Sequence, residues 1–309
     1  MTEQKNSYFH SFLLLLTATI WGVAFVAQSV GMDYIGPATF VASRSVVAVV
    51  VLTPLVWLLR RRETVAQPKE KASPSEILRG GAICGALLFG GMLTQQVGII
   101  YTSVGKAGFI TTFYVVLVPL LGVVLGRKIG LRIWLAVLLA ITGLYFLCMR
   151  PGGFSIGLGD AMVLVSACFY TVQITCVDRF VTRIDGVLLS YMEMIACAVL
   201  GLLAAFLLET PSWPDILRAA LPILYAGGCS SALGYTFQII GQKGVSPTVA
   251  ALIMSLESCI SAIAGWLILH EVMSAREITG CILMFAAILL SQLPASTWQH
   301  LHLRKREHS

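Results

Sequence analysis

The chain has 309 residues, of which 57% are hydrophobic and only 12% are charged, and its mean hydropathy is +0.86. Soluble domains have roughly 25% charged residues, so this composition excludes a soluble globular protein and predicts a membrane protein. A net charge of +6 would suggest a nucleic-acid partner in a soluble protein. Here we expect no such partner, because the basic residues gather between apolar segments, where they mark topology.

Ten apolar segments follow one another along the chain. At about 20 residues each, they are long enough to cross the hydrocarbon core of a bilayer as helices. The sequence therefore predicts an all-α polytopic membrane protein that lies in the lipid bilayer with ten transmembrane helices. The segments lie at 10–30, 37–59, 77–100, 105–126, 131–149, 160–178, 186–208, 216–240, 247–269 and 276–293.

The distribution of Lys and Arg predicts the orientation. With a cytoplasmic N-terminus, 16 of the 21 Lys and Arg residues fall on the cytoplasmic side and four on the other side, while Arg44 lies inside the second segment. Because cytoplasmic loops carry the excess of basic residues, we expect both termini in the cytoplasm. The stretch 294–309 is then a basic cytoplasmic tail.

A weak internal repeat divides the chain. A shift of 149 residues superimposes TATIWGVAFVAQ (17–28) on SACFYTVQITCV (166–177), and a shift of about 141 aligns the junctions that precede the fourth and ninth segments. We therefore expect two five-helix repeats, 10–149 and 160–293. Since five is odd, the second repeat enters the membrane from the opposite side. Inverted repeats of this kind support alternating exposure of a central site, which favours a transport function.

The C-terminal part carries a recognisable order of motifs. SPTVAALIMSLES at 246–258 is followed by GWLILHE at 265–271 and by a last apolar segment. This order resembles the drug/metabolite transporter superfamily, specifically its EamA-like members, and the likeness extends over residues 10 to 293. The resemblance implies a transporter of amino acids, metabolites or drug-like solutes in a bacterial inner membrane, commonly an exporter. Arg127 and Lys128 stand where many relatives carry an acid, and Ser258 stands where proline often follows the glutamate.

Three charged residues lie within the predicted helices. Glu257 follows Pro247 by ten residues, which at helical rise is about 15 Å and brings it near mid-membrane. An ionised carboxylate is costly there. Glu257 is therefore either a proton acceptor or counter-ion for a cationic group, or a packing carboxylate bonded to Ser255 or Ser258. Arg44 and Glu193 are repeat-equivalent and lie in opposite leaflets, each as a gating or interface residue, or as a side chain that snorkels from a cavity wall.

Polar and aromatic side chains at mid-depth form the candidate substrate site. Aromatic rings combined with a few amides suit a modest organic solute, although each side chain could equally pack between helices. We also expect Pro119 to break the fourth helix and free carbonyls there. The candidates are Trp21, Gln95, Gln96, Thr111, Tyr114, Tyr170, Gln173, Tyr235 and Gln238.

Enzyme motifs do not account for the chain. GLGD at 157–160 matches the GxGD pattern of intramembrane aspartyl proteases, but the other aspartates lie at predicted helix ends or in loops. Two aspartates must share a proton in such a site, so Asp160 is interpreted as the N-cap of the sixth helix. Walker A, GxSxG and GxGxxG patterns are absent from the sequence. We therefore expect a secondary transporter that works by alternating access without ATP, with no catalytic residue, metal or cofactor; the alternative is a passive facilitator or channel.

Overall fold

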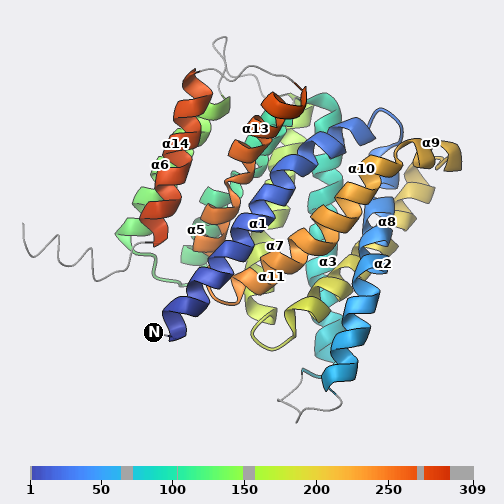
Figure 1. Cartoon of the computed structure of the whole chain (residues 1–309), viewed down its shortest axis with the longest axis horizontal. Coiled ribbons are helices and arrows are strands. Elements are labelled where there is room, and N and C mark those ends of the chain that lie inside the picture. Colours follow the sequence, from blue (N-terminus) through green and yellow to red (C-terminus); the bar gives the residue numbers. More distant parts are fainter. Residues whose placement is uncertain (1, 64–71, 103, 149–156, 270–274, 293–309) are drawn as a thin grey trace, which may run out of the picture.

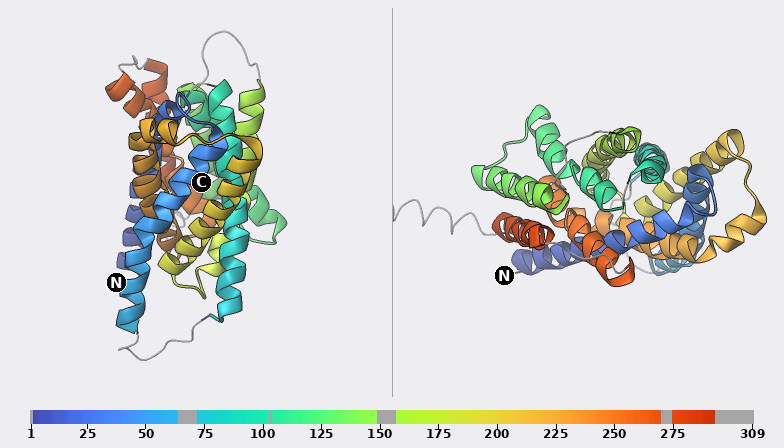
Figure 2. Two further views of the ribbon diagram at one scale, coloured as in Figure 1. Left: turned by 90° about the vertical axis from the view of Figure 1, so that its right-hand side faces the viewer. Right: turned by 90° about the horizontal axis from the view of Figure 1, so that it is seen from above.

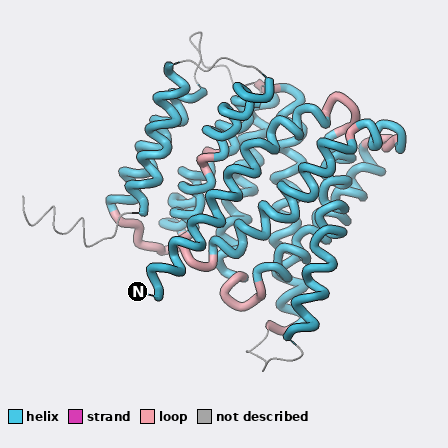
Figure 3. The backbone as a smooth tube through the Cα atoms, in the orientation of Figure 1, coloured by secondary structure: helices cyan, strands magenta, loops and turns pink. Residues whose placement is uncertain are grey.

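The computed structural model describes residues 2–63, 72–102, 104–148, 157–269 and 275–292. The regular structure of these residues is helical throughout (Figure 1), and most of the connecting turns lie at the two ends of the bundle (Figure 3). The prediction of an all-α polytopic membrane protein is confirmed. The predicted basic tail at 294–309 lies outside the described residues.

The helices of the predicted first repeat are α1 (Thr2–Gly31), α2 (Pro37–Glu63), α3 (Pro74–Tyr101), α4 (Val104–Thr111), α5 (Tyr114–Val124) and α6 (Leu131–Cys148). Those of the second are α7 (Leu158–Phe180), α8 (Gly186–Leu208), α9 (Trp213–Arg218), α10 (Ala220–Leu224), the π-helix η1 (Tyr225–Gly234), α11 (Tyr235–Gln242), α12 (Pro247–Met254), α13 (Glu257–Leu269) and α14 (Ala275–Gln292).

Most of the predicted spans correspond to one of these helices or to a broken pair. Among the described residues, seven helical segments are long and apolar enough to cross a membrane, and two of these run through the breaks α4–α5 and α12–α13. Shorter apolar stretches cover 131–143 in α6 and 278–291 in α14. The predicted eighth span at 216–240 is not one helix but is divided among α9, α10, η1 and α11.

The fourth predicted helix breaks at a different place from the one expected. The break falls at Thr112 and Phe113, between α4 and α5, and Pro119 lies inside α5. The Thr112 hydroxyl donates to the carbonyl oxygen of Phe109 at 2.8 Å, and the amide of Phe113 donates to the carbonyl of Ile110. The helix continues through Pro119, so the prediction that this proline breaks it is wrong.

The ninth predicted helix breaks in the same way, although it contains no proline at that point. Ser255 lies between α12 and α13, and its hydroxyl donates to the carbonyl of Leu252 at 2.7 Å. Ser258 repeats the contact one turn later with the carbonyl of Ser255, also at 2.7 Å. Both breaks therefore contain a short hydroxyl side chain that bonds its own backbone, a contact that Ser166 also makes within the unbroken α7.

The π-helix η1 contains small residues, and its carbonyls accept bonds from α1. The indole nitrogen of Trp21 donates to the carbonyl of Ser230 at 3.2 Å, and the hydroxyl of Thr17 donates to that of Gly234 at 3.2 Å. Backbone groups inside a membrane need partners within the protein, and α1 supplies them for this widened turn. Segments of π-helix occur frequently at functional sites.

The packing of the helices places η1 and the broken helices near the centre. α3 packs along α7 and α8, α2 packs along α8 and η1, and α1 packs along η1, α11 and α13. α6 and α14 pair with each other at one side of the bundle, as Figures 1 and 2 show. α1, α3 and α7, together with the helices that pack against them, therefore surround the middle of the molecule.

The start of α7 differs in detail from the expected cap. Gly157 is the residue that precedes the helix, so the N-cap interpretation of Asp160 is wrong by three residues. The carboxylate of Asp160 accepts from the amide of Gly157 at 2.9 Å and from the hydroxyl of Thr102, which follows α3, at 2.7 Å. An acid in the first turn stabilises a helix through the same exposed N–H groups that an N-cap would satisfy.

Glu209 of the second predicted repeat binds the first turn of a helix in the first predicted repeat. It follows α8, and its carboxylate accepts from the amides of Ala38 and Thr39 at 2.8 and 2.9 Å and from the hydroxyl of Thr39. These groups form the first turn of α2, where the partial positive charge of the helix favours an anion.

We expect Glu209→Ala to lower the free energy of unfolding by about 1–3 kcal/mol, because it leaves two N–H donors of α2 without their charged acceptor. Denaturant or thermal unfolding of the purified protein measures this. Asp215→Ala is the matched control, because its ion pair with Arg218 is largely exposed and contributes less than about 1 kcal/mol. Equal effects of the two substitutions would contradict the assigned role of Glu209.

Candidate functional site

A cavity lies inside the bundle between helices of the two predicted repeats. In this conformation it offers about 30 Å³ to a water-sized sphere, which is room for about two water molecules. α1 to α5 contribute to it from one predicted repeat, and α7, η1, α11 and α13 from the other predicted repeat. Its walls are formed by Trp21, Phe25, Gln28, Arg44, Gln95, Thr111, Tyr114, Tyr170, Gln173, Ile174, Ser230, Tyr235, Gln238 and Glu257.

The predicted site residues line this cavity with two exceptions. Gln96 turns toward α1, where its side-chain nitrogen donates to the carbonyl of Gln28 at 3.1 Å. Glu193 is fully buried behind the cavity wall. The geometry therefore gathers the other candidates into one site, while their part in binding stays a prediction.

Four lining residues were missing from the sequence-based set. Phe25 and Gln28 follow Trp21 by one and two helical turns, and Ile174 follows Tyr170 by one turn. Helical periodicity would have found these three, since residues four and seven apart share a face. Ser230 carried no such signal, because its importance comes from partners on α1 and α2.

Glu257 lies where the ninth span is broken. It is the first residue of α13, its side chain is buried, and its Oε1 accepts from the hydroxyl of Tyr114 at 3.0 Å. Tyr114 is in turn the first residue of α5, at the other break. Ser255 and Ser258, the partners expected for a packing carboxylate, donate to backbone carbonyls instead, so that detail of the prediction is wrong.

Arg44 points into the bundle. Its side chain is buried at 2% exposure, which contradicts the alternative that it snorkels from a cavity wall and leaves the gating or interface role as a prediction. Its Nε donates to the hydroxyl of Ser231 and its Nη2 to that of Ser230, both at 2.9 Å. Among the described residues no carboxylate forms an ion pair with it. Arg44 is thus a buried cation held by neutral oxygens.

Glu193 begins a chain of side-chain hydrogen bonds that ends at the cavity. Its carboxylate accepts from Nε2 of Gln173 at 2.8 Å, and Oε1 of Gln173 accepts from Nε2 of Gln238 at 3.2 Å. An ionised carboxylate is only a hydrogen-bond acceptor, so Glu193 must face the side-chain nitrogen of Gln173. This fixes the orientation of the side-chain amides of both Gln173 and Gln238. Oε1 of Gln238 is then left buried without a partner among the described residues. It is an acceptor in the cavity wall.

A second chain of hydrogen bonds links helices of the two predicted repeats. The hydroxyl of Tyr170 donates to Oε1 of Gln95 at 3.2 Å, and Nε2 of Gln95 donates to the hydroxyl of Thr111 at 2.9 Å. These bonds join α7, α3 and α4 around the same cavity. Together the two chains fix the polar part of the wall in one arrangement.

Trp21 both packs between helices and lines the cavity, so the two alternatives for it are compatible. Its ring lies 4.7 Å from that of Tyr235, centroid to centroid, and it covers Gly234, where an added Cβ would come within 2.5 Å of its Nε1. Tyr170 covers Gly91 in the same manner, at 2.7 Å from an added Cβ. The two rings reach the cavity because these helix positions have no side chain.

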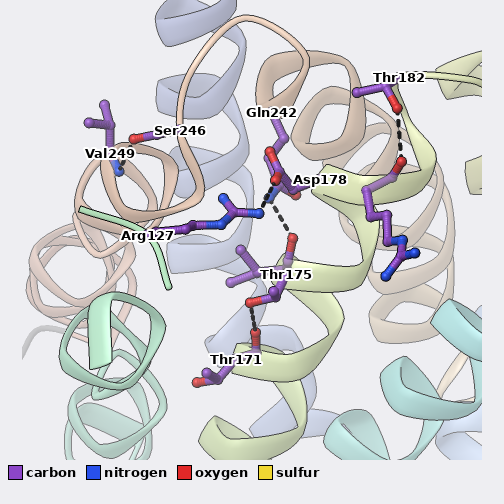
Figure 4. A network of polar contacts seen from close by, with 10 residues as sticks. Arg127, Thr171, Thr175, Asp178, Thr182, Gln242, Ser246 and Val249 are labelled. Carbon is purple, nitrogen blue, oxygen red and sulfur yellow. Dashed lines mark hydrogen bonds and ion pairs between the residues drawn. The ribbon is translucent and has the colours of Figure 1, made fainter. Parts of the chain in front are cut away.

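A polar network surrounds the end of α7 (Figure 4). Arg127, which follows α5, forms an ion pair with Asp178 of α7 at 2.7 Å and so links the two predicted repeats, while Nε2 of Gln242 donates to the carbonyl of Ile174 at 3.0 Å. Ile174 also lines the cavity. Arg127 thus has an acidic partner in Asp178.

Comparison with known proteins agrees with this architecture. The profile of the EamA-like transporter family matches residues 9–149 and 157–293. An uncharacterized transporter of Archaeoglobus fulgidus is 26% identical over 284 residues, covering 91% of this chain and 84% of that protein. The S-adenosylmethionine/S-adenosylhomocysteine transporter of Chlamydia muridarum is 24% identical over 280 residues, covering 84% of each. One solved crystal structure matches with a TM-score of 0.75 and 17% identity over 93% of this chain and 98% of that one, which shows a shared fold.

We expect Gly234→Ala to displace Trp21, lowering thermal stability and changing tryptophan fluorescence, because the new methyl group would occupy the space of the indole and overpacking typically costs about 1–3 kcal/mol. Gly228→Ala in the same π-helix is the control, since an added Cβ there meets nothing within 4 Å. Thermal unfolding of both variants tests this, and a Gly234→Ala protein as stable as the control would refute the close packing.

Proposed function

The chain belongs to the EamA-like transporter family and is a multi-pass membrane transporter for small solutes, and we propose that it works by alternating access without ATP. The proposed substrate is an amino acid, metabolite or drug-like solute, and the proposed direction is export from the cytoplasm. The observation that carries the proposal is the cavity, which is buried in mid-bundle and lined by both predicted repeats.

Paired contacts support the inverted repeat on which alternating access depends. Trp21 covers Gly234, and Tyr170 covers Gly91. Each ring belongs to the first helix of one repeat, and each glycine belongs to the third long span of the other. Tyr170 follows Trp21 by 149 residues, and Gly234 follows Gly91 by 143 residues. Exchanging the two repeats therefore exchanges one contact for the other.

A second pair follows the same rule farther along these helices. An added Cβ at Gly98 would meet Val163 of α7, and one at Gly241 would meet Leu14 of α1. Val163 follows Leu14 by the same 149 residues, and Gly241 follows Gly98 by the same 143. We infer that 10–149 and 160–293 are two structurally related units of opposite orientation.

The two broken helices support the position of the substrate site. α4 and α12 each have eight residues, and the segments that follow begin at Tyr114 and Glu257, which are bonded to each other. In secondary transporters, substrate sites form where discontinuous helices of two repeats meet. The Tyr114–Glu257 contact joins the two breaks inside the cavity wall.

The ends of the bundle supply the contacts that alternating access would have to break. On the side assigned to the cytoplasm, the Arg127–Asp178 ion pair joins the repeats. On the opposite side, Glu209 joins α8 to the start of α2. We infer that these contacts separate in turn as one repeat rocks against the other.

We assign the protein to a bacterial inner membrane with both termini in the cytoplasm. The beginning of α1, the end of α2 and the beginning of α3 lie at one end of the bundle (Figure 1). Arg61, Arg79 and Arg183 belong to segments at that end, in agreement with an excess of basic residues on the cytoplasmic side.

The purified protein in liposomes should give saturable counterflow of its solute, because a carrier exchanges solute in both directions through the same cavity. Labelled amino acids, organic acids and organic cations are the set to screen. Flux that rises linearly with concentration and shows no counterflow would instead establish the passive facilitator or channel.

Glu257→Gln tests the proposed role of Glu257 as a proton acceptor. We expect it to abolish uptake driven by a pH gradient while counterflow continues, because glutamine keeps the shape and hydrogen bonding of the side chain without exchanging a proton. Asp215→Asn, in the exposed ion pair with Arg218 of the same helix, is the control and should keep both activities. A Glu257→Gln carrier with unchanged gradient dependence would overturn the coupling role.

A further inference from the structure

We propose that Arg44 is a carboxylate-binding residue, so that the solute carried is an organic anion or zwitterion with a carboxylate and an aromatic or apolar body. This inference rests on the proposed function, since it names the class of solute that the same cavity takes. It starts from the charge on Arg44, which nothing in the described structure neutralises.

The cavity has few ways to hold a charge. Among the described residues that line it, Arg44 carries the permanent positive charge and Glu257 the acid. Glu257 has its own donor in the hydroxyl of Tyr114 at 3.0 Å. Arg44 has two serine hydroxyls and no anion. An isolated cation buried at membrane depth is costly, so an anion in the cavity would gain from meeting it.

The guanidinium also has unused donors. A guanidinium carries five N–H groups, and the serine bonds use Nε and one position on Nη2. Nη1 bonds no described atom. Carboxylates match the planar fork of arginine, and such charge-assisted bonds are about twice as strong as neutral ones. The serines fix the plane of the group and leave one edge available.

Ser230 places an apolar surface directly beside this charge. Its hydroxyl accepts from Arg44, while its backbone carbonyl accepts from the indole of Trp21 at 3.2 Å. The ring of Trp21 lies against Tyr235. A solute whose carboxylate meets Arg44 would therefore lay its body along the Trp21–Tyr235 pair, where aromatic or apolar groups pack well.

Two buried acceptors extend the site. Gln28 and Gln238 line the cavity, and Oε1 of each is buried without a hydrogen-bond partner among the described residues. An unpaired buried acceptor costs free energy until a donor reaches it. The solute should therefore also carry an N–H or O–H group away from its carboxylate.

The test compares carboxylates with their neutral amides. The probes are phenylalanine with phenylalaninamide, methionine with methioninamide, and 3-phenylpropionate with 3-phenylpropionamide. Binding to the purified wild-type, Arg44→Gln and Arg44→Lys proteins is measured by calorimetry or thermal shift, without any transport step. Arg218→Gln, at an exposed ion pair outside the cavity, is the control.

We expect at least one carboxylate to bind the wild type about tenfold or more tightly than its amide, and Arg44→Gln to remove that preference. Arg44→Lys should keep part of it, because the charge remains without the fork. Arg218→Gln should bind as the wild type does.

Three results would overturn the proposal: no carboxylate preference in the wild type, a preference that survives Arg44→Gln, or equal weakening of acid and amide by that substitution. The last would mean that Arg44 serves only to join α2 to η1. Counterflow of neutral or cationic solutes with no carboxylate preference would leave the transporter function intact and remove this inference. Arg44-dependent carboxylate binding without any counterflow would support this inference and contradict the proposed carrier function.

Discussion

Inside a bilayer every buried polar group must find its partner within the protein, because hydrocarbon offers none. The structure depends on this constraint at each place where a helix is irregular. At the two breaks, Thr112 and Ser255 bond their own backbones. At the π-helix η1, Trp21 and Thr17 of α1 satisfy its carbonyls. The irregular backbone is therefore confined to the centre, where other helices cover it and a cavity can form.

The same constraint gives meaning to the buried side chains whose hydrogen bonding is incomplete. Arg44 has hydroxyls but no counter-charge among the described residues, and Gln238 has an acceptor with no donor. A structural core would favour apolar residues at such positions, since half-satisfied polar networks are costly. The proposed carboxylate solute would give a transporter a reason to keep them, because it would complete the network only while it is bound.

Individual residues show how far the sequence could reach toward this site. The length and depth of the apolar segments selected Trp21, Tyr170 and Glu257, which the fold brings to one cavity. The prediction that Gln96 lines the cavity is wrong because two adjacent glutamines cannot both face the same way on a helix. The side chain of Gln96 turns toward α1 instead. The prediction that Pro119 breaks the fourth helix is wrong because proline is tolerated inside membrane helices, and the break lies at Thr112 and Phe113.

By itself the sequence determined the class of the protein, the extent of its spans and its resemblance to one transporter family, because hydrophobicity and length are local properties that a bilayer reads directly. Only the tertiary structure decided which polar groups meet. The Tyr114–Glu257 bond, the serines on Arg44 and the chain from Glu193 to Gln238 each join residues on different helices. Such partnerships depend on helix rotation and on two breaks and a π-helix, and these are set by packing between helices.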